Sequence, residues 1–288
     1  MDLKSIMVPF SGGDGEEGAL RTAFELGKAH NAHVEAWHVT PSPYNMSTVY
    51  YPGQGLEPIY SEKILQELKR SYEESSNNAL HKFSMMAEEM GIEPVHDGVI
   101  PDHASASFHH EIGDADEIIS LRSRLCDMSV ISRATSEENK LFHGIVYSTL
   151  FDSARPVLLI PAGKSLNFSN TKIIIAWNNS LEAARAIAFS FPLLEHAKVL
   201  VWSDSRENQN PSSGSGDLLH YLRLHGTEAE ELFPNATTPE SLLMTAKTLG
   251  ASMIVMGAYS HSRFRETILG GMTNFMLKNA NIPVFLAH

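Results

Sequence analysis

The chain has 288 residues, of which 43% are hydrophobic and 19% are charged, and its formal net charge is −12. The apolar content excludes a disordered chain. The negative charge argues against broad binding to nucleic acid or to an anionic membrane, where phosphate contacts supply most of the affinity. A single cysteine, Cys126, excludes an intramolecular disulfide and fits a reducing compartment. No signal-peptide pattern opens the sequence and no segment approaches the ~18 apolar residues of a membrane span, so we expect a cytoplasmic protein.

Short apolar runs alternate with longer amphipathic runs from the start of the sequence. Residues 5–12 and 34–37 predict strands, and the run between them, with Leu20, Phe24 and Leu26, predicts a helix. Strands that alternate with helices in this way are typical of a parallel sheet with helices on both faces. We therefore expect an α/β fold.

A tyrosine-rich segment and a long helix follow. Residues 44–60 predict either a surface loop that packs its own tyrosines or a loop that covers a ligand. Between about Ser61 and Met90, apolar residues recur at steps of three and four, which predicts a helix with one buried stripe. The stripe consists of Leu65, Leu68, Tyr72, Ala79, Phe83, Met86 and Met90. Gly91 is the predicted C-terminal cap of this helix.

Three histidines, His103, His109 and His110, lie near a predicted helix start, with Glu111 and Asp114 close by. Imidazole binds many metals, so the cluster could suit a metal ion. No CxxC or HExxH pattern supports a metal site. Ordinary exposed histidines are the alternative interpretation.

Five landmarks of the first half recur in the same order in the second half. Four are apolar runs, in which residues 5–12, 34–37, 127–132 and 155–160 match residues 172–179, 199–202, 252–257 and 282–287. The fifth is the apolar pattern of the first helix of each half. Such a repeat predicts a duplicated supersecondary unit. We place the two domains at residues 1–161 and 171–288, joined by a short linker rich in Gly, Ser and Asn.

The second half contains further signals of alternating structure. A helix is predicted at about 217–224 and a strand near 230–233. Another helix should begin after Thr238, a plausible N-cap, with Pro239 at its first position.

The segment after the apolar run 253–256 has the layout of a phosphate cradle. The run ends at Gly257, a polar loop carries Arg263 and Arg265, and the pair Gly270 and Gly271 opens a predicted helix that contains Thr273. Backbone N–H groups at a helix start are unpaired and favour an anion. The alternative is a tight connection with no ligand.

This segment resembles the nucleotide-binding signature of the universal stress protein family. The signature consists of Gly, two residues, Gly, nine residues, Gly, and then Ser or Thr. Gly257 and Gly270 match its first and third glycines. Ser260 replaces the second glycine, Gly271 replaces the hydroxyl residue, and Thr273 supplies a hydroxyl two positions later.

The resemblance covers both halves and implies a tandem universal stress protein. The implied fold is adenine nucleotide alpha hydrolase-like, with two tandem doubly wound α/β domains. Each domain would contain a five-stranded parallel sheet of order 3-2-1-4-5. The family commonly dimerises through the last strand, so residues 157–160 and 284–286 would join the two halves as an internal pseudo-dimer. A homodimer of the whole chain stays open.

The resemblance also implies a ligand, ATP with Mg²⁺, in the second domain. In an open parallel sheet, a ligand lies at the carboxyl ends of the strands where the strand order reverses. Ala176 and Trp177 would line an adenine pocket, although Trp177 could equally pack inward. Asn178 stands where the family has an acidic residue that contacts ribose or adenine, and could instead be a turn residue. The other implied contacts are Gly257, Ser260, Arg263, Gly270, Gly271 and Thr273.

The first half lacks this signature. Ser11 stands in the place of the acidic residue, and no glycine occurs between Ser132 and Gly144. Glu137 and Glu138 would repel a phosphate group. We predict that this half is a degenerate domain that binds no nucleotide in this way.

These patterns lead to a stress-response binding module that holds ATP or a related nucleotide in its second domain. The alternative is a stress protein that binds another small molecule, or that acts only through protein partners. No Gly-x-Ser-x-Gly elbow, catalytic carboxylate pair or Cys–His dyad stands out, so at most weak ATP hydrolysis is expected.

Overall fold

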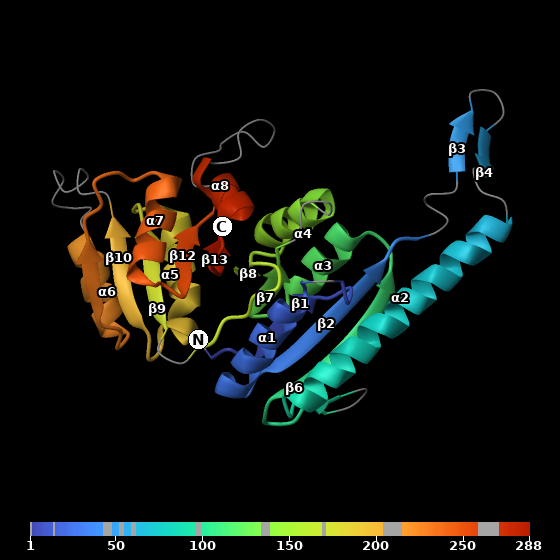
Figure 1. The fold of residues 1–288 in the computed structure, drawn as a ribbon, viewed down its shortest axis with the longest axis horizontal. Coiled ribbons are helices and arrows are strands. Elements are labelled where there is room, and N and C mark those ends of the chain that lie inside the picture. The colour runs from blue at the N-terminus through green and yellow to red at the C-terminus, as the bar shows by residue number, and fades with distance from the viewer. Residues whose placement is uncertain are drawn as a thin grey trace.

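The computed structural model describes residues 2–13, 15–42, 48–51, 55–58, 62–95, 99–133, 139–168, 171–203, 215–258 and 271–288. The chain forms two α/β units that share one sheet (Figure 1). Within the described residues, no helix has both the length and the apolar character needed to span a bilayer.

The first unit has a parallel sheet with the predicted strand order. Its main strands are β1 (Ser5–Pro9), β2 (His33–Thr40), β6 (Ser105–Ile112), β7 (Met128–Ser132) and β8 (Val157–Ile160), with the short β5 (Glu93–Pro94) at the edge. They lie in the order β8-β7-β1-β2-β6-β5, which is 5-4-1-2-3 followed by the extra edge strand. The helices are α1 (Glu17–His30), α2 (Glu62–Glu89), α3 (Ala115–Ser123) and α4 (Asn139–Asp152). A hairpin of β3 (Thr48–Tyr51) and β4 (Gly55–Pro58) stands apart from this sheet.

The second unit repeats the arrangement. Its strands are β9 (Lys172–Trp177), β10 (Lys198–Ser203), β11 (Ala229–Leu232), β12 (Met253–Gly257) and β13 (Val284–Ala287), in the order β11-β10-β9-β12-β13. The helices are α5 (Leu181–Leu194), α6 (Ser215–Leu224), α7 (Pro239–Leu249) and α8 (Gly271–Asn279). The prediction for α7 is confirmed, because the Thr238 hydroxyl accepts a hydrogen bond from the Ser241 N–H at 3.2 Å and Pro239 opens the helix.

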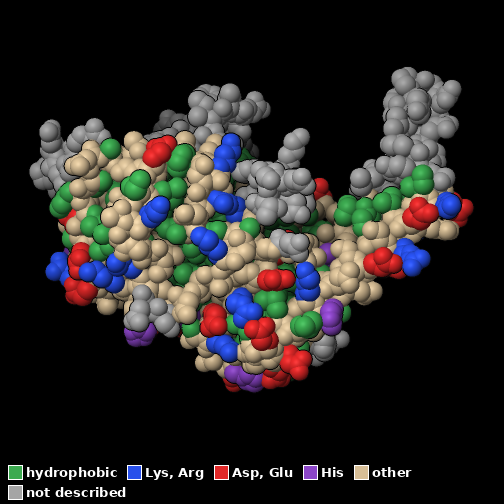
Figure 2. Space-filling model, viewed as in Figure 1, with side chains coloured by type: hydrophobic (Ala, Val, Ile, Leu, Met, Phe, Trp, Pro, Cys, Tyr) green, Lys and Arg blue, Asp and Glu red, His purple; other side chains and the backbone are tan. Residues whose placement is uncertain are grey.

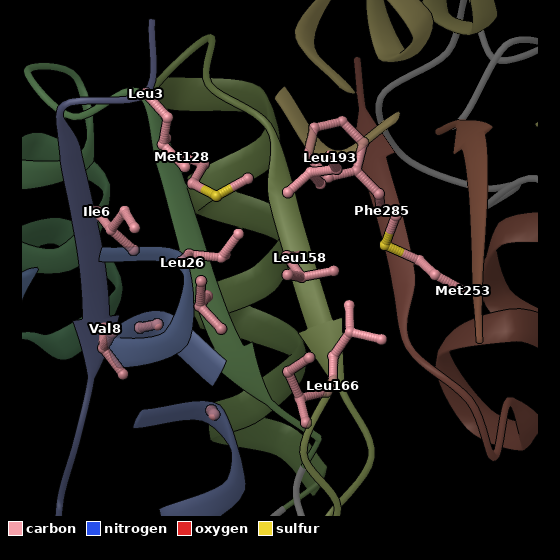
Figure 3. Close-up of a cluster of buried hydrophobic side chains, with 14 of the residues drawn as sticks. Leu3, Ile6, Val8, Leu26, Met128, Leu158, Leu166, Leu193, Met253 and Phe285 are labelled. Carbon is pink, nitrogen blue, oxygen red and sulfur yellow. The ribbon is translucent and has the colours of Figure 1, made fainter. Parts of the chain in front are cut away.

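The last strands of the two units pair with each other, as the resemblance implied. β8 and β13 are antiparallel, with Leu158 opposite Phe285, and they join the two sheets into one of eleven strands. Leu158, Leu166, Leu193 and Phe285 belong to a single buried cluster that spans both units (Figure 3). The junction is therefore part of the hydrophobic core, and its burial stabilises the arrangement of the units.

The segment between the units packs against α1 and is hydrogen-bonded to it. The N–H of Leu166 donates to the Thr22 hydroxyl at 2.9 Å, and the N–H of Gly163 donates to the carbonyl of Gly15 at 3.0 Å. Leu166 is buried, with 4% of its surface exposed. A Cβ added to Gly18 would lie 1.7 Å from the carbonyl oxygen of Lys164. Only glycine on α1 lets the segment approach so closely, so the predicted linker is a packed element. The boundaries 1–161 and 171–288 themselves stay a prediction.

Two cations, one in the first unit and one in the segment between the units, reach the carboxyl end of α8 in the second unit. The Arg133 guanidinium donates to the carbonyls of Lys278 and Ala280, at 3.2 and 2.5 Å. Lys164 donates to the carbonyl of Asn281 at 2.6 Å. Carbonyls at the end of a helix lack intrahelical partners and carry partial negative charge, so these contacts favour docking of the two units.

The long helix α2 is only partly as predicted. Its end is confirmed, because Gly91 adopts a left-handed φ of 62° and the N–H of Ile92 returns to the carbonyl of Ala87 at 2.8 Å. The prediction of a single buried stripe along the whole helix is wrong. Its second half, Ala79, Phe83, Met86 and Met90, is buried on the sheet, whereas Leu65, Leu68 and Tyr72 are only half-buried. The helix runs past the edge of the sheet, so nothing of the sheet lies beneath its first turns (Figure 1).

The helix start predicted near His109 and His110 is also wrong. Both residues lie in strand β6, which pairs with β2 over its whole length. Alternation along a strand sends the two side chains to opposite faces of the sheet. The strand mixes polar and apolar residues, so its sequence lacks the simple alternation that predicts a strand.

Candidate functional site

The candidate site lies where the strand order of the second unit reverses. β9 pairs with β10 on one side and with β12 on the other, and all three strands are parallel. Helix α5 packs on one face, where Ala186 and Ile187 join the cluster of Ile173 and Ile175. Helix α8 packs on the other face, where Met276 and Leu277 join the cluster of Ile174. The carboxyl ends of β9 and β12, which we call the switch point, are the position where open parallel sheets hold ligands.

Gly257 ends β12 at the switch point, and its lack of a side chain has a packing reason. A Cβ placed there would lie 2.5 Å from the N atom of Ala183 and 2.9 Å from Cβ of Glu182, in the first turn of α5. Its backbone does not adopt the left-handed conformation of a glycine turn. The glycine therefore lets α5 begin directly against the end of β12. Whether a phosphate also approaches this backbone stays a prediction.

Ala176 and Trp177 face opposite sides of the sheet. Ala176 packs against the cluster on the α7 and α8 side, whereas Trp177 packs against the cluster on the α5 side. The structure thus places Trp177 as a packing residue, the alternative considered for it. Its indole N–H is buried and has no hydrogen-bond partner within the described residues.

Asn178 forms a turn at the start of α5. Its Oδ1 accepts a hydrogen bond from the N–H of Ser180 at 3.3 Å, and Asn179 is left-handed, with φ of 57°. The Ser180 hydroxyl then accepts from the N–H of Ala183 at 3.1 Å and caps the helix. The geometry is that of the turn residue, and Asn178 remains exposed beside the switch point.

Two further residues of the signature segment, Gly271 and Thr273, lie at the start of α8. A Cβ on Gly271 would meet no atom of the described residues within 4 Å, so packing against them does not require this glycine. Thr273 is buried, with 2% exposed, in the first turn of α8. Ser260, Arg263, Arg265 and Gly270 lie outside the described residues.

Trp202 is a candidate that sequence reasoning missed. It lies in β10 directly beside Ala176 of β9 and packs on the same α7 and α8 side. Its side chain is 4% exposed, and its buried indole N–H has no partner within the part of the chain that is described. Buried hydrogen-bond donors are normally paired, so the indole N–H of Trp202 is a donor that a ligand beside the switch point could use. The repeat contained a signal for this position. Trp202 matches Trp37, so it is expected near the end of the second strand of its unit, which pairs with the first strand.

Comparison with known proteins identifies the second unit. Residues 170–288 match the family model described as the Universal stress protein family. This unit is a universal stress protein domain. No curated protein matches the chain in sequence.

Solved structures with the universal stress protein fold resemble the chain over its whole length. A universal stress protein from Archaeoglobus fulgidus DSM 4304 matches with a TM-score of 0.71 and 15% identity, covering 98% of this chain and 97% of the other. A putative universal stress protein from Pseudomonas aeruginosa UCBPP-PA14 matches with a TM-score of 0.61 and 16% identity, covering 99% and 93%. At such identities the likeness shows the fold alone. It confirms the tandem arrangement of two doubly wound sheets.

The corresponding position of the first unit is occupied by its own carboxylate. Glu16 accepts hydrogen bonds from the N–H of Ser11 at 2.7 Å, the Ser11 hydroxyl at 3.0 Å and the N–H of Gly13 at 3.3 Å. Helix α2 lies directly over this turn, because a Cβ on Gly12 would be 2.9 Å from Cα of Ala79. The donors that an anion would use at the end of β1 are therefore taken. Glu137 and Glu138 lie outside the described residues.

Two histidines of the first unit, His33 and His109, take part in a hydrogen-bonded ladder between β2 and β6. His33 contacts the hydroxyls of Ser105 at 2.8 Å and Ser107 at 3.0 Å, and Ser107 also contacts His109 at 2.8 Å. Burial lowers the pKa of both His33 and His109 below the ordinary value. His103 instead pairs with Glu93 at 2.6 Å on the surface.

Within the described residues, no group of three or more His, Cys, Asp or Glu side chains could hold a metal ion. The thiol of Cys126 is buried, and burial raises its pKa to about 11. It is therefore a thiol at neutral pH and a poor nucleophile.

Proposed function

We propose that the protein is a stress-response binding module whose second universal stress protein domain binds ATP, with Mg²⁺, or a related nucleotide at the switch point. One observation carries the proposal. The reversal of strand order between β9 and β12 coincides with the glycine-bounded segment that resembles the family's nucleotide signature. The start of α8 follows that segment, and a helix start of this kind would face the phosphates.

The described residues suggest separate roles around such a nucleotide. Ala176 and Trp202 lie together at the end of β9 and β10, where a flat base could pack, and the Trp202 indole could donate to it. Asn178 is exposed and could bond a sugar hydroxyl. Gly271 and Thr273 would contribute backbone and hydroxyl donors to phosphate. Ser260, Arg263 and Gly270 complete the set as sequence-based assignments.

The first unit is proposed not to bind a nucleotide at its equivalent position. The carboxylate of Glu16 already accepts from Ser11 and Gly13, and a phosphate would have to displace it against charge repulsion. We therefore expect one nucleotide for each chain.

Calorimetric titration of the whole chain with ATP and Mg²⁺ tests the proposal. We expect saturable binding with a stoichiometry near one. The decisive variant is Gly271→Asp, since its Cβ would meet none of the described residues within 4 Å and the variant places a carboxylate at the start of α8. This charge should weaken ATP binding by roughly tenfold or more, while an acidic residue at a helix start does not lower stability.

Gly271→Asn is the matched control, because it has the same shape without the charge. It should bind ATP within about threefold of the wild type, less than ~1 kcal/mol. Absence of saturable binding by the wild type, or equal binding by the Asp and Asn variants, would reject a phosphate at this helix start.

A ligand other than a nucleotide is the second candidate, and the packing of Gly257 favours it. The first turn of α5 fills the space beside this glycine and brings Glu182 next to the switch point. A side chain that carries negative charge in this first turn disfavours phosphate nearby and would suit a ligand with fewer negative charges. Mass spectrometry of small molecules that copurify with the protein would distinguish the two candidates.

A further inference from the structure

Helix α2 is held on the sheet by its second half. The helix has 28 residues, and its buried side chains begin at Ala79. Figure 2 shows charged side chains exposed along the projecting half of the helix. An ion pair at 3.6 Å joins Lys82 to Glu17 of α1, and a second, at 3.0 Å, joins α2 to α1 through Glu89. Exposed ion pairs stabilise little, so the attachment of α2 depends mainly on the packing of its second half.

A buried histidine lies where α2 leaves the sheet. His38 is near the carboxyl end of β2 and is 2% exposed. Its Nδ1 lies 3.3 Å from the carbonyl oxygen of Phe10. Two residues after Phe10, a Cβ on Gly12 would be 2.9 Å from Cα of Ala79, the first buried residue of α2. His38 and the start of the packed half of α2 are therefore at the same end of the sheet.

The ring of His38 lies on the face of the sheet that α2 covers. Its centroid is 6.3 Å from that of Phe108 in β6, and Phe108 is 5.6 Å from Phe83 of α2. His110 is directly opposite His38 in β6, with the two ring centroids 5.4 Å apart. Phe108 thus links His38 to the packed half of the helix.

A second proton on His38 would have no acceptor. Nδ1 faces a carbonyl oxygen, so Nδ1 carries the proton of the neutral ring and a second proton would bind to Nε2. Nε2 is buried and has no hydrogen-bond partner within the described residues. A buried N–H without an acceptor and a buried charge without a counterion both cost free energy. The charged ring is therefore compatible with this structure only if water reaches it.

We propose that His38 is an acid-sensitive switch that releases the packed half of α2 from the sheet when the pH falls. Strands β1 and β6, on either side of β2, are fixed by backbone pairing along their lengths. Helix α2 is held mainly by side-chain packing and already extends past the sheet at this end. It is therefore the cover that can lift and admit water to the imidazolium. This proposal does not depend on nucleotide binding.

The groups that face His38 give it no counterion. From β1 comes the carbonyl of Phe10, and from β6 comes His110, whose Nε2 lies 2.9 Å from the hydroxyl of Thr40. From α2, Lys82 donates to the carbonyl of Gly12 at 2.7 Å and pairs with Glu17 of α1. The named cations near this site oppose a further positive charge.

The sign of the pH dependence follows from these surroundings. Burial lowers the pKa of His38, the Phe10 carbonyl raises it, and His110 lowers it further, with a net decrease. In the open state the ring is hydrated and its pKa is near 6.5. Protons therefore bind the open state more tightly, and the closed state loses stability as the pH falls below that value.

Hydrogen exchange of the full chain, followed by mass spectrometry in low concentrations of urea, tests the proposal. A local opening exposes little surface, so its equilibrium constant is nearly independent of urea, whereas global unfolding depends on it steeply. Residues 79–89 of the wild type should exchange by a local opening. Its equilibrium constant should rise about tenfold from about pH 7.5 to pH 5.0, within the limit of ~30-fold that one proton sets. Amides of α5 should exchange only by urea-dependent unfolding.

Two variants of His38 remove the proposed switch. His38→Phe keeps a ring beside Phe108 but cannot take up a proton, so the opening of α2 should change less than about twofold over the same pH range. His38→Gln cannot be protonated either, and it provides the same test if circular dichroism shows that the Phe variant is unfolded.

His109→Phe is the matched control. His109 lies on the opposite face of β6, burial lowers its pKa as well, and a phenyl ring can keep the stack on Trp37. This variant should keep the pH dependence of the wild-type opening.

Three results would overturn the proposal. One is an opening of residues 79–89 that is the same at both pH values. Another is exchange of these residues that follows urea-dependent unfolding at every pH. The third is a pH dependence that survives in His38→Phe or His38→Gln, or that His109→Phe removes to the same extent.

Discussion

The backbone N atom of Ala183 occupies the space that a side chain on Gly257 would need. A Cβ there would be 2.5 Å from the N atom of Ala183, which itself donates to the Ser180 hydroxyl that caps α5. The end of β12 and the start of α5 are thus fitted to each other. A glycine that resembles part of a ligand signature therefore has a structural role of its own.

Replacement of Gly257 should destabilise the second domain. Gly257→Ala forces β12 and the first turn of α5 apart, and overpacking of this kind costs ~1–3 kcal/mol. Urea unfolding followed by circular dichroism would measure the loss. Gly271→Ala is the matched control, since its Cβ would meet no described residue within 4 Å, and its free energy of unfolding should stay within ~0.5 kcal/mol of the wild type. Equal losses in the two variants would contradict the packing role.

The junction between the two units should respond sharply to a methyl group on α1. In Gly18→Ala the new Cβ would lie 1.7 Å from the Lys164 carbonyl, so the segment after β8 must lift from the helix. We expect a loss of about 3 kcal/mol and faster proteolysis between residues 161 and 168. Gly216→Ala, in α6, adds a methyl group that would meet no atom of the described chain within 4 Å, and it should change neither measurement.

Removal of the Arg133 guanidinium should weaken the docking of the units. In Arg133→Met the carbonyls of Lys278 and Ala280 lose a charged donor, with an expected loss of ~1–2 kcal/mol in the free energy of unfolding. Arg223→Met removes an exposed arginine whose hydrogen bond within the described part of the chain goes to the carbonyl of Leu219 in its own helix, so it should cost less than ~0.5 kcal/mol. Indistinguishable unfolding curves for the two variants would argue against the capping role of Arg133.

Stability should fall as the pH drops through the range of histidine titration. Burial lowers the pKa of His30, His33, His38 and His109 in the folded chain. The unfolded chain therefore binds more protons below its own histidine pKa, near 6.5, and the free energy of unfolding decreases from about pH 7.5 to pH 5.5. Above that range the histidines are neutral in both states and this loss disappears. Melting temperatures across the range would show the trend.

His38 should account for part of this pH dependence. Its side chain is 2% exposed, Nδ1 lies 3.3 Å from the Phe10 carbonyl oxygen, and Nε2 has no partner within the described residues. His38→Phe keeps an aromatic ring among Phe108 and its neighbours but cannot take up a proton, so the slope of stability with pH should be shallower. His103→Gln, at an exposed position, is the control. A slope unchanged in His38→Phe would show that His38 does not contribute.

Much of the fold could be predicted from local patterns. The repeat of apolar strands in one order led to two parallel sheets, and the cap formed by Thr238 and Pro239 located the start of α7. Strand β6 was missed because His109, His110 and Glu111 obscure its alternation. The stripe of α2 was read correctly as a periodicity, but periodicity does not tell where the underlying sheet ends.

The candidate site was predicted less completely than the fold. Topology placed the ends of β9 and β12 side by side, and the structure agrees, since Ala176 pairs with Met256, next to Gly257. That these residues and the start of α8 form one site stays a prediction. The sequence could not show that Trp177 packs on the α5 face of the sheet or that Trp202 lies beside Ala176. Nor could it show that Glu16 binds the backbone donors at the equivalent position of the first unit. These facts depend on which segments pack together across long separations in the chain.

By itself the sequence determined the class of fold, the duplication and the caps, because hydrophobic period and turn chemistry act between near neighbours. Only the tertiary structure decided at which glycines another backbone segment takes the place of a side chain. It also decided where α2 leaves the sheet, and how Arg133 and Lys164 bind the end of α8. Those outcomes arise from close packing and charge between residues far apart in the chain, which no local pattern encodes.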